Sequence, residues 1–150
     1  MNALHKGRSF LMFLEKKQFL LNREIHCINR KLITIDDKLK NAMSEIEHLN
    51  KQLEDIIPSG VQSREQIYNM IRAQGMLLSC QQEIVQYILS LEDNKKELEA
   101  MMAKCCHAKK MLDKRQTKIS SWVLKLKYES NIQIDFQLEN EIQEIAVYGK

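Results

Sequence analysis

The feature that most constrains this chain is a long repeat of apolar residues spaced alternately three and four positions apart. From residue 11 to residue 56, 13 of the 14 positions of the repeat are apolar. A repeat of about 3.5 residues keeps one side of a helix facing a partner, so it predicts a left-handed coiled coil. We call these positions the seam: Leu11, Leu14, Gln18, Leu21, Ile25, Ile28, Leu32, Ile35, Leu39, Ala42, Ile46, Leu49, Leu53 and Ile56.

The repeat stops at Ile57-Pro58-Ser59-Gly60, which contains the only proline of the chain. Proline ends a helix and glycine permits a tight reversal, so we expect a turn over residues 57–63. Ser63-Arg64-Glu65-Gln66 then matches a capping box, in which the Ser63 and Gln66 side chains satisfy each other's backbone N–H groups. A second helix is predicted to begin there.

The second helix continues the seam less regularly, with 13 of 18 positions apolar. Its polar seam residues, which lower stability but help to fix register, are Gln74, Gln81, Lys95, Lys109 and Gln116. Its other seam residues are Ile67, Met70, Leu77, Ile84, Ile88, Leu91, Leu98, Met102, Cys105, Leu112, Ile119, Val123 and Leu126. Residues 132–138 alternate apolar and polar like a strand, but neighbouring Glu, Gln and Asn residues favour a helix that a partner orders.

Together these patterns predict an all-α fold: one long antiparallel two-helix coiled-coil hairpin over residues 1–150, with an overhanging C-terminal helix. The first helix is expected over about residues 4–56 and the second over about residues 64–145. A short reversal predicts that Ile56 faces Ile67 and that Ile35 faces Ile88. In that register about 34 residues of the second helix overhang the first, roughly 50 Å.

The net charge is only +3, but charge is sorted along the chain. Residues 1–33 carry +5 and residues 104–127 carry +7, whereas residues 34–103 carry −5 and residues 128–150 carry −4. In an antiparallel hairpin the two basic segments share the open end. Solvated helices usually mix both signs, so the sorting favours an acidic partner at that end, although solubility and local ion pairing are the simpler alternative.

The sequence lacks the motifs of phosphate loops, zinc proteases, serine hydrolases and calcium sites. A two-helix coiled coil also offers no dry cavity for catalytic groups, so we expect no enzymatic activity and no cofactor. Cys105-Cys106-His107 is not expected to bind a metal, because successive helical side chains point about 100° apart and no second ligand pair follows.

Four cysteines without disulfide spacing indicate a reducing, cytoplasmic environment. No apolar run approaches the roughly 20 residues that span a bilayer, so we expect no direct membrane insertion. Trp122 and Tyr128, beside Lys125 and Lys127, can stack on bases, but no nucleic-acid-binding motif accompanies them. Aromatic and basic residues also enrich protein interfaces, so a protein partner is favoured and nucleic acid is not expected.

Several segments resemble one known family. Ser63 to Tyr68, Arg72, Gln74, the segment 93–99 and the W-x-x-K-x-K segment at 122–127 carry the resemblance, together with the chain length and the position of the turn. The chain resembles the central-stalk proteins of type III secretion, FliJ of flagella and YscO of injectisomes, and in particular the InvI/SpaM branch of Salmonella- and Shigella-type systems. The resemblance extends over nearly the whole chain.

The resemblance implies a non-enzymatic stalk that lies in the cytoplasm, peripheral at the base of the secretion apparatus. Such a stalk inserts into the hexameric secretion ATPase, promotes its assembly and activity, contacts the cytoplasmic domain of the export gate and binds secretion chaperones. The residues expected to contact the ATPase ring are Arg8, Lys16, Lys17, Lys114, Arg115, Lys118, Trp122, Lys125 and Lys127. Those expected to contact the export gate are Tyr68, Ile71, Arg72 and Gly75.

Two other functions stay open from the sequence. One is an escort for chaperones or substrates, and the other is a generic coiled-coil scaffold or dimeric tether. The apolar residues expected on outer faces of the helices leave the oligomeric state undecided: Ile33, Met43, Val85 and Leu89.

Overall fold

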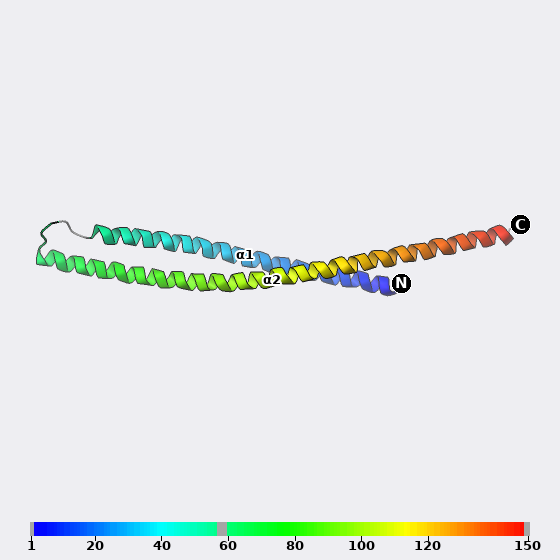
Figure 1. The fold of residues 1–150 in the computed structure, drawn as a ribbon, viewed down its shortest axis with the longest axis horizontal. Helices are drawn as coiled ribbons and strands as arrows, with labels where there is room; N and C mark the ends of the chain where they lie inside the picture. The colour runs from blue at the N-terminus through cyan, green and yellow to red at the C-terminus, as the bar shows by residue number, and fades with distance from the viewer. Residues whose placement is uncertain (1, 57–59, 149–150) are drawn as a thin grey trace. The chain divides into compact units, whose positions relative to one another are not determined.

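The computed structural model describes residues 2–56 and 60–148, and these residues form an all-α fold. Helix α1 spans Asn2–Asp55 and helix α2 spans Arg64–Tyr148 (Figure 1). The expected limits were 4–56 and 64–145. The two helices pack against each other without strands in the described ranges, which confirms the predicted helical hairpin. Residues 57–59 of the expected turn lie outside the described residues.

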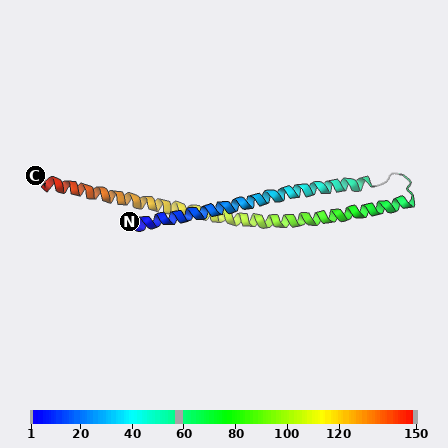
Figure 2. The same cartoon turned by 180° about the vertical axis from the view of Figure 1, so that it is seen from behind.

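The chain divides into two compact units, each built from both helices. The terminal unit comprises Met1–Ile25 and Cys105–Lys150, and the turn unit comprises His26–Lys104. In Figures 1 and 2 the terminal unit holds the dark blue stretch of α1 and the yellow-to-red stretch of α2. Within each unit the stretch of α1 runs antiparallel to the stretch of α2.

The predicted seam faces inward in both units. All 14 seam positions from Leu11 to Ile56 are buried or half-buried, and so are 16 of the 18 on α2. The exceptions are Ile67 and Gln74 near the start of α2, where Ala73 is half-buried instead. Because two helices cover each other on one side only, few seam side chains are fully buried. The buried apolar residues are Leu14, Ile28, Ala42, Leu91, Cys105 and Val123.

The register of the pairing differs from the prediction by one heptad. Three polar contacts join residues whose numbers add up to 131: Asp36 with Lys95 at 2.8 Å, Asn50 with Gln81 at 2.7 Å, and Gln18 with Asp113 at 2.7 Å. In each contact one residue lies in the seam and the other directly follows a seam residue. Seam residues whose numbers add up to 130 therefore face each other. The predicted pairs Ile56–Ile67 and Ile35–Ile88 add up to 123, so that register was wrong.

The cause of the error is the repeat itself. A slip of seven residues returns every seam position to the seam, so the apolar pattern cannot distinguish registers that differ by one heptad. Polar residues within and beside the seam make the distinction. In the predicted register Lys95 would face Ile28, whereas in the structure its ammonium reaches the Asp36 carboxylate.

The ion pair between Lys95 and Asp36 shifts the protonation of the lysine. The hydrogen bond from Lys95 to Asp36, and then the charge of that carboxylate, raise the pKa of Lys95 above its ordinary value. A raised pKa means that the ammonium form is favoured in the folded chain. The lysine is therefore charged at neutral pH, and its contribution to the pair is lost as the pH rises through the raised pKa.

The corrected register also shortens the overhang of α2. The start of α1, at Ala3 and Leu4, lines one pocket together with residues of α2: Leu126, Glu129, Ser130, Gln133, Ile134 and Gln137. Every described residue after Ser130 is exposed. We therefore define the overhang as residues 131–148, about 27 Å of helix and not the roughly 50 Å predicted. The helical interpretation of residues 132–138 is confirmed.

Local chemistry fixes the start of α2 as predicted. The Gln66 backbone N–H donates to Ser63 Oγ at 3.2 Å, and the Ser63 backbone N–H donates to Gln66 Oε1 at 3.0 Å. This is the reciprocal capping box, which satisfies two N–H groups that a helix start would leave free. Upstream, Gly60 has a φ of 107°, which side chains other than hydrogen disfavour.

We expect the register to be measurable by disulfide crosslinking. In a chain whose four native cysteines are replaced by serine, Leu39→Cys with Leu91→Cys should form an intramolecular disulfide under mild oxidation, because these positions add up to 130. The control pair, Leu39→Cys with Ile84→Cys, tests the register one heptad away and should stay reduced. Gel mobility and mass spectrometry distinguish the two, and crosslinking of the control pair alone would contradict the structure.

A second prediction compares two glycines. A Cβ atom on Gly7 would lie 2.7 Å from Cγ2 of Val123, whereas one on Gly75 would meet nothing within 4 Å. Alanine is favoured over glycine inside a helix by about 1 kcal/mol. Gly75→Ala should therefore raise the free energy of unfolding by about that amount, and Gly7→Ala should raise it less or lower it. Urea unfolding followed by circular dichroism measures both, and equal stabilisation would contradict the close approach at Gly7.

Candidate interaction surfaces

The nine residues predicted to contact an ATPase ring all lie in the terminal unit, and all are exposed. Three lie on α1 and six on α2: Arg8, Lys16 and Lys17, then Lys114, Arg115, Lys118, Trp122, Lys125 and Lys127. Within residues 2–56 and 60–148 the one ion pair is Asp36–Lys95, so no carboxylate neutralises these basic groups by direct contact. Their charge is available to a partner.

The four residues predicted to contact an export gate lie together in the turn unit. Tyr68, Ile71, Arg72 and Gly75 follow one another at helical spacing near the start of α2, and all four are exposed. The Arg64 guanidinium lies 5.9 Å from the centre of the Tyr68 ring, a cation–π contact that extends this surface toward the capping box. The structure thus places the predicted set on one exposed face.

An exposed apolar surface on α1 was not predicted. We define the α1 outer face as Phe10, Met12, Phe13, Lys16, Lys17, Phe19 and Leu20. Its apolar side chains are between 41% and 66% exposed. The Lys17 ammonium lies 5.1 Å from the centre of the Phe13 ring, and the Phe10 and Phe13 ring centres are 6.1 Å apart. The signal was present in the sequence, since these apolar residues fall outside the seam.

A second apolar surface lies on the overhang, where the sequence predicted a helix that a partner orders. Ile134, Leu138, Ile142 and Ile145 recur at spacings of four, four and three residues, so they follow one face of the helix. All four are about half exposed or more. We call this face the overhang stripe. The overhang also carries four carboxylates and no basic side chain: Asp135, Glu139, Glu141 and Glu144.

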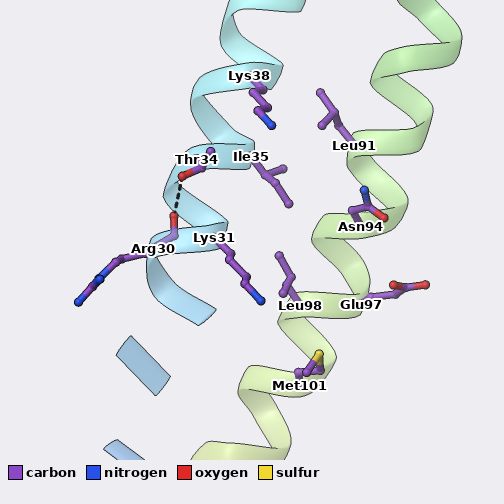
Figure 3. Close-up of a pocket in the computed structure, with 10 residues that line it drawn as sticks. All are labelled: Arg30, Lys31, Thr34, Ile35, Lys38, Leu91, Asn94, Glu97, Leu98 and Met101. Carbon is purple, nitrogen blue, oxygen red and sulfur yellow. Dashed lines mark hydrogen bonds between the residues drawn. The ribbon is translucent and has the colours of Figure 1, made fainter. Parts of the chain in front are cut away.

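The turn unit has an open groove of about 450 Å³ along the helix pair. In Figure 3 Ile35, Leu91 and Leu98 point into the space between the helices, whereas Arg30 and Glu97 point away from it. The Thr34 hydroxyl donates to the Arg30 carbonyl at 2.9 Å, within its own helix. In the part of the chain that the structure describes, no three His, Cys, Asp or Glu side chains gather in a way that could hold a metal ion. The groove is a gap in seam packing.

The cysteines differ in their surroundings. Cys105 is buried in the seam, as its position in the repeat predicted, whereas Cys27, Cys80 and Cys106 are exposed. Burial, followed by the charge of Glu24 and the neighbouring Cys106, raises the pKa of the Cys105 thiol. A raised pKa lowers the fraction of reactive thiolate at neutral pH.

We expect the reactivity of the thiols to follow this difference. At neutral pH, iodoacetamide should modify Cys27, Cys80 and Cys106 quickly and Cys105 at least about tenfold more slowly, since burial limits both its ionisation and its access. Peptide mass spectrometry over a time course measures the four rates. In urea the four rates should converge, and a fast Cys105 in the native chain would contradict its place in the seam.

Neither helix, over the residues that the structure describes, contains a stretch both long and apolar enough to cross a membrane. The fold and its surfaces define a class of protein: a helical hairpin whose outward faces are basic, acidic and apolar in turn. Residues 5–146 match the family described as Salmonella surface presentation of antigen gene type M protein.

The match covers nearly the whole chain, so the chain belongs to this family, and it is a component of type III secretion. The resemblance found at the turn and the capping box is confirmed. No curated protein matches the chain, and no solved structure does.

Proposed function

We propose that the chain is the non-enzymatic central stalk of a type III secretion apparatus. In this role it lies in the cytoplasm at the base of the apparatus, inserts into the hexameric secretion ATPase and promotes assembly and activity of the ring. It also links the ring to the export gate and binds secretion chaperones. Membership of a type III secretion family supports the proposal, as does the likeness of the sequence to stalk proteins.

The observation that carries the proposal is the positive charge of the terminal unit. Residues 105–127 hold seven basic side chains and one acidic one, and Arg8, Lys16 and Lys17 of α1 lie in the same unit. Clustered exposed charge of one sign speeds association with an oppositely charged surface and orients it. The proposal therefore requires acidic side chains on the surface of the ring that the stalk contacts.

The surface around Tyr68 and Arg72 supports a second contact. It belongs to the turn unit, whereas the basic residues belong to the terminal unit, so the two contacts use separate residues. Tyrosine and arginine are enriched among residues that dominate binding energy at protein interfaces. One chain can thus bind the ring and the gate without the two partners competing for the same side chains.

Charge reversal tests the contact with the ring. Lys118→Glu, Lys125→Glu and Lys127→Glu combined should abolish stimulation of ATP hydrolysis by the purified secretion ATPase, because they oppose the charge that the contact needs. The matched control combines Lys40→Glu, Lys51→Glu and Lys96→Glu, which are exposed lysines of the turn unit with the same change in net charge. The control should still stimulate the ring. Circular dichroism checks that both variants remain helical, and full stimulation by the first variant would refute the contact.

An escort for chaperones or substrates is the second candidate, and the exposed apolar side chains of the α1 outer face favour it. Amphipathic partners bind such faces through apolar anchors. An escort binds secretion chaperones but leaves the hydrolysis rate of the ring unchanged. The same assay with the unaltered chain therefore separates the two functions.

A further inference from the structure

Two exposed faces of the terminal unit have opposite charge. Residues 5–23 of α1 hold five basic side chains and one acidic one, whereas the overhang holds four acidic side chains and no basic one. Both faces also expose large apolar side chains, among them Met12 and Phe19 on α1 and Leu138 and Ile142 on the overhang. Exposed apolar patches bordered by charge mark interaction sites.

The spacing of the apolar residues also matches. On α1, Met12 and Phe19 lie seven residues apart on the side of the helix away from the seam, with Lys16 between them. On the overhang, Leu138 and Ile145 are also seven residues apart, with Ile142 between them. Two helices whose apolar residues recur at this spacing can pack side by side as in a coiled coil.

The two faces do not meet within one chain. The overhang continues α2 beyond the start of α1 (Figures 1 and 2). Each of its described residues is exposed. The α1 outer face begins near the point where the overhang starts, but it extends along α1 in the opposite direction. A second copy of the chain, turned end to end, supplies the missing face at both places.

We propose that two copies of this chain associate by exchanging their overhangs, so that the overhang stripe of each copy packs on the α1 outer face of the other. A two-fold axis makes the exchange reciprocal, which is the commonest symmetry of protein dimers. Each overhang then lies parallel to the α1 helix that it contacts. The result on each side is a three-helix cluster of α1, α2 and the partner's overhang. In this cluster the acidic overhang lies against the basic start of α1.

The α1 outer face alone would also suit an anionic membrane, since basic and aromatic residues border each other there. The overhang argues against that occupant. It lies in the same unit and its four carboxylates would be repelled by the same lipids. A second copy provides a counterpart for both faces. The exchange is argued without the stalk function, but it covers Lys16 and Lys17, so in the dimer these two lysines are not free to contact an ATPase ring.

Sedimentation velocity of the full chain, over low to high micromolar concentrations, tests the exchange. The unaltered chain should show a monomer–dimer equilibrium, and Leu138→Glu with Ile142→Glu should weaken it at least about tenfold. The matched control, Ile33→Glu with Met43→Glu, places two glutamates at exposed apolar positions of the turn unit and should leave it unchanged. All four positions are exposed, and circular dichroism verifies that helicity is retained.

A mixing experiment distinguishes the exchange from other dimers. A chain with Phe19→Glu and Leu20→Glu should be monomeric alone, and so should the chain altered in the overhang. Mixed, they should form a heterodimer, because one intact overhang then meets one intact α1 outer face.

A wild-type chain that stays monomeric throughout overturns the proposal, as does an overhang variant that dimerises normally or a mixture that stays monomeric. Monomers that instead bind phosphatidylglycerol vesicles through Phe19 and Leu20 would assign the α1 outer face to a membrane surface.

Discussion

Two helices that touch along a single stripe can bury only that stripe, and the seam between α1 and α2 has this character throughout. Its side chains are mostly half-buried, with a few buried residues such as Leu14 and Leu91 spaced along it. Each layer of the seam contacts only its neighbours, so stability accumulates along the length as it does in repeat proteins. Among the residues that the structure describes, the buried side chains are spread along both helices and do not gather in one central core.

The same geometry leaves most of each helix facing solvent, and the residues there are free to vary in charge and polarity. The chain uses that freedom in blocks: basic and aromatic along the start of α1, acidic and aliphatic on the overhang, and a tyrosine–arginine face at the start of α2. This component of type III secretion therefore carries several chemically different surfaces, distributed along its two helices.

The sequence was most informative where a local pattern has one physical solution. The capping box of Ser63 and Gln66 is such a case, because both of its hydrogen bonds depend on residues three apart. The side of each helix that faces its partner could be predicted equally well, because the 3.5-residue repeat selects one side of each helix. Every predicted interaction residue is exposed for the same reason: it lies outside that repeat.

Two features could not be predicted from the sequence in this way: the register of α1 against α2, and the close approach of the two helices at Gly7. The register depends on which polar groups, such as Lys95 and Asp36, meet across the two helices. The seven-residue repeat carries no information about that choice. The role of Gly7 needs the register first, because only then does Val123 lie against it. The degeneracy has an evolutionary consequence: an arm can gain or lose seven residues at a time without turning any seam side chain to solvent. The reach of such a hairpin can therefore change in steps of about 10 Å while its packing chemistry stays the same.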